Sequence, residues 1–134
     1  MIRIGQVSAV NHAAGTVRVA FADRDDAVSA DLPVVVPGGG AQGNPLPLPG
    51  QTVLCAFTAA GSSAGFCLGT YYGGDEKPPG TEEQRGVWFE DGSYVFYDRK
   101  QHSLNVKAAG AVNIEGDLTV TGIVRAASIK EAGE

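Results

Sequence analysis

The sequence predicts an all-β protein, in which a small N-terminal barrel is followed by a C-terminal β-helix that several chains build together. Three observations support this fold class. The chain of 134 residues contains nineteen Gly and seven Pro, which separate strands and destabilise helices. Its first half holds five short segments that suit β-strands. Near its end, Gly110, Gly116 and Gly122 recur six residues apart.

The five segments of the first half are residues 2–10, 16–22, 32–36, 52–57 and 66–72. The first two form a predicted hairpin across residues 11–15, because Val17, Val19 and Phe21 alternate with Arg18 and Ala20. Residues 37–50 are rich in Gly and Pro, so they form a predicted loop. Five short strands within about 70 residues favour a small closed barrel, and the five-stranded OB-fold is the commonest of these.

A change of composition predicts a domain boundary. Residues 73–85 are polar, charged and rich in Pro and Gly, as linkers commonly are. We therefore expect a barrel domain at 1–72, a linker at 73–85 and a second part at 86–134. The aromatic segment 87–97 is apolar on both faces and is predicted to be buried on both.

The C-terminal segment divides into four hexads that begin at residues 106, 112, 118 and 124. In every hexad the first residue is a branched aliphatic, the third is apolar and the fifth is Gly or Ser. Because side chains alternate along a strand, the first and third positions can form one apolar stripe, which consists of Val106, Ala108, Val112, Ile114, Leu118, Val120, Val124 and Ala126. Gly at the fifth position suits a corner, where a missing Cβ permits unusual backbone angles and close approach of another chain.

A hexapeptide period is typical of β-helices, but a single-chain β-helix needs several stacked coils to cover its core. Four hexads supply little more than one triangular coil. The stripe is therefore predicted to be the core of a homotrimer, in which three copies wind about one axis. The alternative is an ordinary antiparallel meander in which the glycines are coincidental.

The order of these segments carries a resemblance. A barrel that ends in CLGTYY (67–72), a Pro/Gly/acidic linker, WFEDGSYVFYDR (88–99) and hexads ending in TVTGIV (119–124) resemble the phage baseplate assembly protein V family. These proteins are the central spikes of contractile phage tails and tailocins. The resemblance implies a homotrimer whose OB domains dock under the tail hub and whose C-terminal helix is a membrane-piercing point. It also implies a place in the baseplate of a virion or tailocin that is assembled in the host cytoplasm.

The chain departs from this family at its tip. Many members end in a His-x-His motif that holds an iron ion, whereas residues 122–134 contain no His. We therefore expect no metal and no cofactor. Three arrangements of residues 123–134 stay open: a differently capped β-turn, a short helix, or a surface for a separate PAAR-type tip protein.

Charge and cysteine content limit the other function classes. The net charge of −5 and pI near 4.9 oppose nucleic-acid binding, which needs clustered positive charge. The N-terminus has no secretory signal, and no apolar run approaches the roughly 20 residues that span a bilayer; we expect a soluble protein that stays in the cytoplasm unless other machinery exports it. Cys55 and Cys67 lie on either side of a predicted turn at 58–65, so they are expected to face each other, reduced and buried.

No catalytic residue is predicted. His102 has no nucleophile at motif spacing, the acidic groups Asp23/Asp25/Asp26 and Glu82/Glu83 lie in polar loops, and Gly38–Gly40 lacks the Lys of a phosphate-binding loop. Two alternative functions remain: an OB-fold module that binds single-stranded nucleic acid, and a trimer resembling the hexapeptide-repeat acyltransferases. The first needs exposed aromatics among basic residues, and the second needs more coils and a catalytic His.

Overall fold

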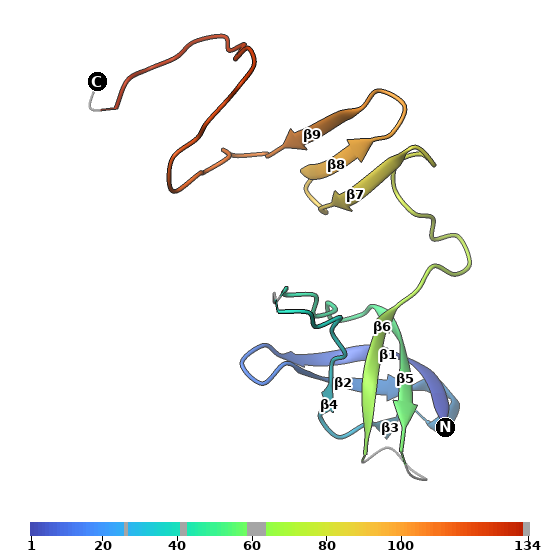
Figure 1. Ribbon diagram of the computed structural model, residues 1–134. Helices are drawn as coiled ribbons and strands as arrows, with labels where there is room; N and C mark the ends of the chain where they lie inside the picture. The colour runs from blue at the N-terminus through green and yellow to red at the C-terminus, as the bar shows by residue number, and fades with distance from the viewer. Residues whose placement is uncertain (26, 41–42, 59–63, 133–134) are drawn as a thin grey trace. The chain divides into compact units, whose positions relative to one another are not determined.

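The computed structural model describes residues 1–25, 27–40, 43–58 and 64–132 (Figure 1). The protein is all-β: among these residues there is no α-helix, and the strands form two antiparallel sheets. The chain divides into two units, Met1–Pro78 and Pro79–Glu134. The division falls within the segment that the sequence predicts to be a linker.

The first unit contains six strands in one sheet, whose path is β3-β2-β1-β5-β6. The long strand β1 (Ile2–Asn11) pairs with β2 (Thr16–Phe21) on one side and with β5 (Thr52–Phe57) on the other. Strand β6 (Gly65–Thr70) follows β5, and the short strands β3 (Ala27–Val28) and β4 (Leu32–Pro33) both pair with β2. The 3₁₀ turn η1 (Ala22–Arg24) joins β2 to β3.

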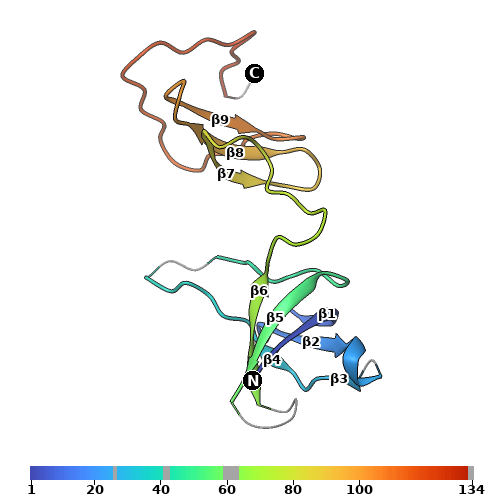
Figure 2. The same ribbon diagram turned by 90° about the vertical axis from the view of Figure 1, so that its right-hand side faces the viewer.

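The sheet closes on itself just after β4. Val34 forms a parallel bridge with Cys67 of β6, and the Val35 backbone N–H donates to the Cys67 carbonyl at 2.9 Å. The pairings therefore run in a ring from β1 through β2, β4, β6 and β5 back to β1. Figure 2 gives a second view of these strands curving around a common interior.

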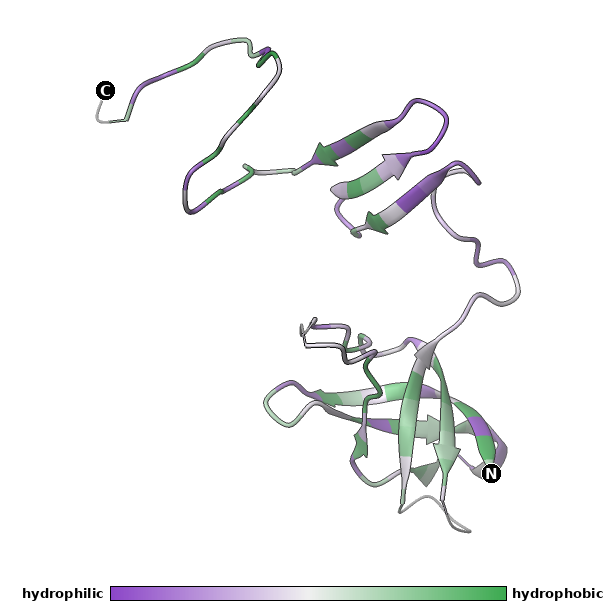
Figure 3. Cartoon of the chain, in the orientation of Figure 1, coloured by the Kyte–Doolittle hydropathy of each residue, from purple (hydrophilic) through white to green (hydrophobic). Residues whose placement is uncertain are grey.

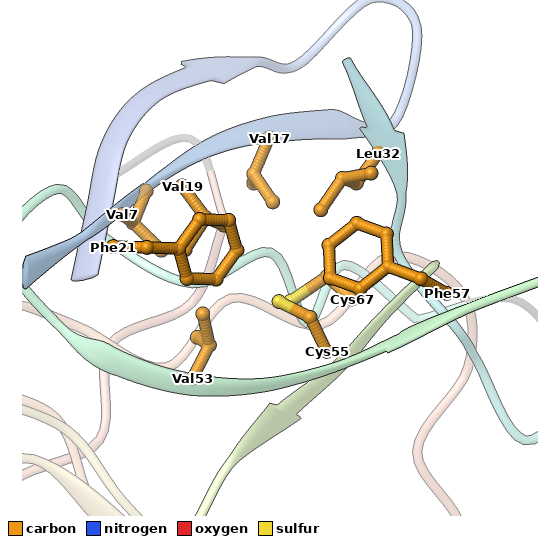
Figure 4. Packing of buried hydrophobic residues seen from close by; sticks show 9 residues of the cluster. All are labelled: Val7, Val17, Val19, Phe21, Leu32, Val53, Cys55, Phe57 and Cys67. Carbon is orange, nitrogen blue, oxygen red and sulfur yellow. The ribbon is translucent and has the colours of Figure 1, made fainter. Parts of the chain in front are cut away.

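Nine apolar residues fill that interior (Figure 4). They come from alternate positions of β1, β2, β5 and β6 and from β4, because successive side chains of a strand point to opposite faces. Phe21 and Phe57 meet edge to face, with ring centroids 5.8 Å apart. The whole cluster comprises Val7, Val17, Val19, Phe21, Leu32, Val53, Cys55, Phe57 and Cys67.

The predicted strands of this unit need three corrections. The predicted strand 32–36 is shorter: β4 ends at Pro33, because Pro has no backbone N–H to continue a ladder, and only the single bridge at Val34 follows. The predicted strand 66–72 begins one residue earlier and ends two residues earlier than expected, as Gly65–Thr70. Strand β3 was not expected at all. The turn predicted at 58–65 lies largely outside the described residues.

The second unit begins with a three-stranded meander of β7 (Gln84–Trp88), β8 (Tyr94–Asp98) and β9 (Ser103–Lys107). The turn between β7 and β8 is fixed by Asp91, whose carboxylate accepts a hydrogen bond from the Ser93 N–H at 2.9 Å. The Asp98 carboxylate similarly accepts from the N–H groups of Lys100 and Gln101. After β9 the described chain continues to residue 132 without another strand.

Candidate assembly surface

The predicted trimer-core stripe lies at the end of β9 and in the extended chain that follows. Val106 belongs to β9, Ala108 follows it half-buried, and the other six residues are exposed. The large members of the stripe expose between 47% (Val120) and 69% (Leu118) of their surface. Apolar and polar residues alternate along this segment in Figure 3. The stripe is thus an apolar surface that the described residues of its own unit leave uncovered.

The backbone of this segment bends at a regular interval. Bends occur at residues 109–110, at 116, at 121–122 and at 127. Each of the three predicted corner glycines, Gly110, Gly116 and Gly122, lies in a bend, and Ser128 directly follows the fourth. The six-residue period of the sequence therefore recurs in the backbone as bends about six residues apart.

The three glycines do not share one conformation. Gly116 has φ of +118°, in the range that side chains rarely adopt, whereas Gly110 and Gly122 have no positive φ. A Cβ at any of the three would meet no atom within 4 Å in this chain. Of the three glycines, only Gly116 has the expected unusual backbone angle. At Gly110 and Gly122, only a second chain could approach the backbone closely enough to require the absence of a Cβ.

The same segment lacks backbone hydrogen bonds to the described residues. The last hydrogen bond before it runs from the Ala109 N–H to the Ser93 hydroxyl at 2.9 Å. For residues 110–132, no backbone hydrogen bond joins two described residues. Backbone N–H and C=O groups are strong hydrogen-bonding groups that folded structures pair. The free N–H and C=O groups of this extended segment can therefore form β-ladder hydrogen bonds with other chains.

The β7–β9 sheet also leaves one face uncovered. Its cross-strand rows are Val87–Val95–Val106 and Arg85–Tyr97–Leu104. We call the apolar members of these rows, Val87, Val95, Tyr97, Leu104 and Val106, the open face. Val95 and Tyr97 expose 42% and 41% of their surface, so the expectation that segment 87–97 is buried on both faces is wrong for the single chain.

The opposite face of this sheet carries an aromatic cluster. Trp88 and Phe96 stack with ring centroids 5.3 Å apart, and Tyr94 lies 5.0 Å from Phe96. Gly80 packs under the indole, where an added Cβ would lie 2.7 Å from Trp88. The rings of this face therefore shield one another and are half-buried, whereas the apolar side chains of the open face are exposed.

Sequence reasoning missed this asymmetry although the signal was present. Leu104 and Val106 alternate with Asn105 and Lys107, which is the pattern of a strand with one apolar face. Because Val106 belongs both to the open face and to the stripe, the two surfaces are continuous along the chain.

The titratable residues considered as catalytic candidates are held in ordinary surface contacts. The His102 Nδ1 lies 3.5 Å from the Tyr97 hydroxyl in an exposed turn. Asp23 pairs with Arg3 at 3.7 Å, and Glu83 pairs with Arg99 at 3.6 Å. Asp26 lies outside the described residues. No group of three or more potential metal ligands is found in the part of the chain that the structure describes.

The first unit offers little positive charge for a nucleic-acid backbone. The Arg18 side chain donates to Asp31 at 2.8 Å, and this hydrogen bond together with the carboxylate charge raises the pKa of Arg18. Arg3 lies over the Phe21 ring, 5.2 Å from its centroid, and is largely buried. Two of the few cations of the barrel are thus already paired with acids.

Two open hollows lie on the barrel, of about 280 and 640 Å³. His12 and Val34 help to line the smaller, and Gln51, Tyr71 and Glu76 help to line the larger. Neither brings a nucleophile together with a base and an orienting acid, which is the arrangement that covalent catalysis uses.

Comparison with known proteins supplies no relative for these surfaces. No protein-family model matches the chain, and no curated protein matches it. Within the described ranges, no helix is long and apolar enough to cross a membrane.

Proposed function

We propose that this protein is the central spike of a contractile tail or tailocin baseplate and that it acts as a homotrimer. One observation carries the proposal: an apolar stripe and a set of backbone bends share a six-residue period, and the chain itself neither covers the stripe nor pairs its backbone. The order of sequence motifs that resembles the baseplate assembly protein V family supports the same function.

The pairing order of the first unit supports an OB-fold docking domain. In an OB-fold, five main strands close into a partly open Greek-key barrel. Here β1, β2, β4, β5 and β6 form a closed ring, and β4 is continued by a parallel bridge to β6. In the proposed spike this domain contacts the tail hub or another baseplate protein.

Three copies are the physical solution to the uncovered stripe. Winding three chains around one axis buries the stripe of each against the other two and pairs the backbone of residues 110–132 between chains. It also removes free sheet edges along the shaft, which would otherwise invite aggregation. The open face of the β7–β9 sheet lies at the start of this shaft and extends the buried surface.

The proposed role of the shaft is mechanical. Intertwined chains share an axial load, because one chain cannot leave without disrupting the ladders of both others. The shaft transmits the force of sheath contraction to the target cell envelope. The net charge of −5 on each copy keeps such a rod soluble by mutual repulsion. The exposed Ile123 and Ile129 near the end of the chain suit contact with a separate tip protein.

Two single substitutions test the trimeric shaft. Leu118→Asp places a charge in the proposed core, where three carboxylates would be buried together at a cost of several kcal/mol for each ion. Thr119→Asp places the same charge on the neighbouring, outward position. We expect the native chain and Thr119→Asp to give a heat- and SDS-resistant trimer band, and Leu118→Asp to give monomer.

Equal behaviour of the two variants would contradict the assignment of faces. A native chain that runs as a monomer under mild, non-denaturing conditions would contradict the proposed function itself.

A further inference from the structure

The two cysteines of the barrel lie directly opposite each other. Cys55 of β5 and Cys67 of β6 are partners in the antiparallel ladder, next to a bulge in the register. Both are free thiols and both are fully buried, with 0% of their surface exposed. Figure 4 shows both side chains turned into the same region of the core. The pair is therefore a preformed dithiol.

The backbone geometry of this pair suits a disulfide. Directly opposite residues of an antiparallel ladder have Cα atoms about 4.5–5.5 Å apart. Disulfides join Cα atoms that are about 4.4–6.8 Å apart. Oxidation therefore needs rotation of the two side chains and no shift of β5 against β6.

The two thiols differ in acidity. A hydrogen bond from Cys55 lowers the pKa of Cys67, because it stabilises the Cys67 thiolate. The same hydrogen bond and burial both raise the pKa of Cys55. Since the thiolate is the reactive form of cysteine, the thiol of the pair that ionises first is the nucleophile, and the other thiol resolves its oxidised form.

We propose that Cys55 and Cys67 form an oxidation site, at which a peroxide produces a cross-strand disulfide where the ring of barrel strands closes. The thiolate of one cysteine attacks one oxygen of hydrogen peroxide, the O–O bond breaks, and the departing hydroxide takes up a proton to become water. The sulfur of the other cysteine then attacks the sulfenic sulfur, the S–O bond breaks, and the departing hydroxide takes the proton of that second thiol. Two thiols and one peroxide thus give one disulfide and two waters.

The position of Cys67 gives the disulfide a structural effect. Its carbonyl accepts the hydrogen bond from Val35 that closes the ring of strands, and its backbone bridges Val34. A bond to Cys55 ties this closing contact to β5. It also lowers the conformational entropy of the unfolded chain, which stabilises the folded barrel. Peroxide is small enough to reach the pair during local opening of the hairpin. Both cysteines lie in the barrel, so the disulfide does not depend on trimer formation.

The test uses the full chain in native buffer, with and without hydrogen peroxide. We expect the mass of the non-reduced chain to fall by about 2 Da and both thiols to become unreactive when counted in denaturant. We expect the midpoint of barrel unfolding to rise by about 5 °C or more. Dithiothreitol should reverse all three changes.

Two controls make the result specific. Cys55→Ala and Cys67→Ala each retain one thiol, so peroxide should add oxygen to them or leave them unchanged, without raising the midpoint. For the native chain, two thiols that survive peroxide in the folded state would overturn the proposal. So would added oxygen without loss of mass, a disulfide between chains, or a disulfide that lowers the midpoint.

Discussion

Ser29 holds the edge of the barrel where regular pairing ends. It is the one buried polar residue in the described ranges. Its hydroxyl accepts a hydrogen bond from the Val19 N–H at 3.0 Å and donates to the Ala30 carbonyl at 2.7 Å, while its own N–H donates to the Val19 carbonyl. The Ser29 side chain thus satisfies a buried donor of β2 that no strand reaches.

Replacing this hydroxyl should destabilise the barrel. Ser29→Ala leaves the Val19 N–H buried without an acceptor, at a cost of about 1–3 kcal/mol in the free energy of unfolding. Ser8→Ala is the matched control, because the Ser8 hydroxyl makes an exposed hydrogen bond to Arg18, and it should change stability by less than about 0.5 kcal/mol. Urea unfolding followed by circular dichroism measures both. Equal stabilities of the two variants would show that Ser29 has no such role.

Some residue-level features could be predicted from the sequence and others could not. The alternation of Val17, Val19 and Phe21 identified the buried face of β2, since a period of two is a direct consequence of strand geometry. The cross-strand pairing of the two cysteines followed from their nearly equal distance to a turn and is confirmed. The role of Ser29 could not be predicted, because it depends on where the chain returns after η1.

At the scale of elements, strand length decided what the sequence could predict. Strand β5 (Thr52–Phe57) has six alternating residues and was predicted with its observed bounds. Strand β3 has two residues, too few to show any period, and it exists only because β2 offers an unpaired edge. The meander of β7–β9 could be predicted only in part. Its aromatic segment is apolar at successive positions, so the sequence does not distinguish the face of the aromatic cluster from the open face.

The single Trp of the chain tests the link between this meander and assembly. Trp88 lies in the aromatic cluster of the second unit, so its fluorescence reports that unit. Because folding coupled to association depends on concentration, we expect the Trp88 unfolding midpoint to rise with protein concentration. The Leu118→Asp variant should lose this dependence. A midpoint that is constant over a hundredfold range of concentration would contradict coupled assembly.

At the scale of the whole molecule, the sequence predicted the period but not the ends. The recurrence at Gly110, Gly116 and Gly122 was readable because six-residue spacing requires no tertiary information. The sequence leaves three arrangements of the last residues open, and the described residues 123–132 contain no helix. The proposed contacts with a tail hub or a tip protein could not be predicted in detail, because they depend on the surfaces of those other proteins.

The number of chains in solution decides whether three copies build the shaft. Light scattering of the purified full chain, at micromolar concentration and neutral pH, gives its molar mass without assumptions about shape. A shaft built by three chains predicts about three times the 13.8 kDa of one chain. A mass equal to that of one chain would contradict it.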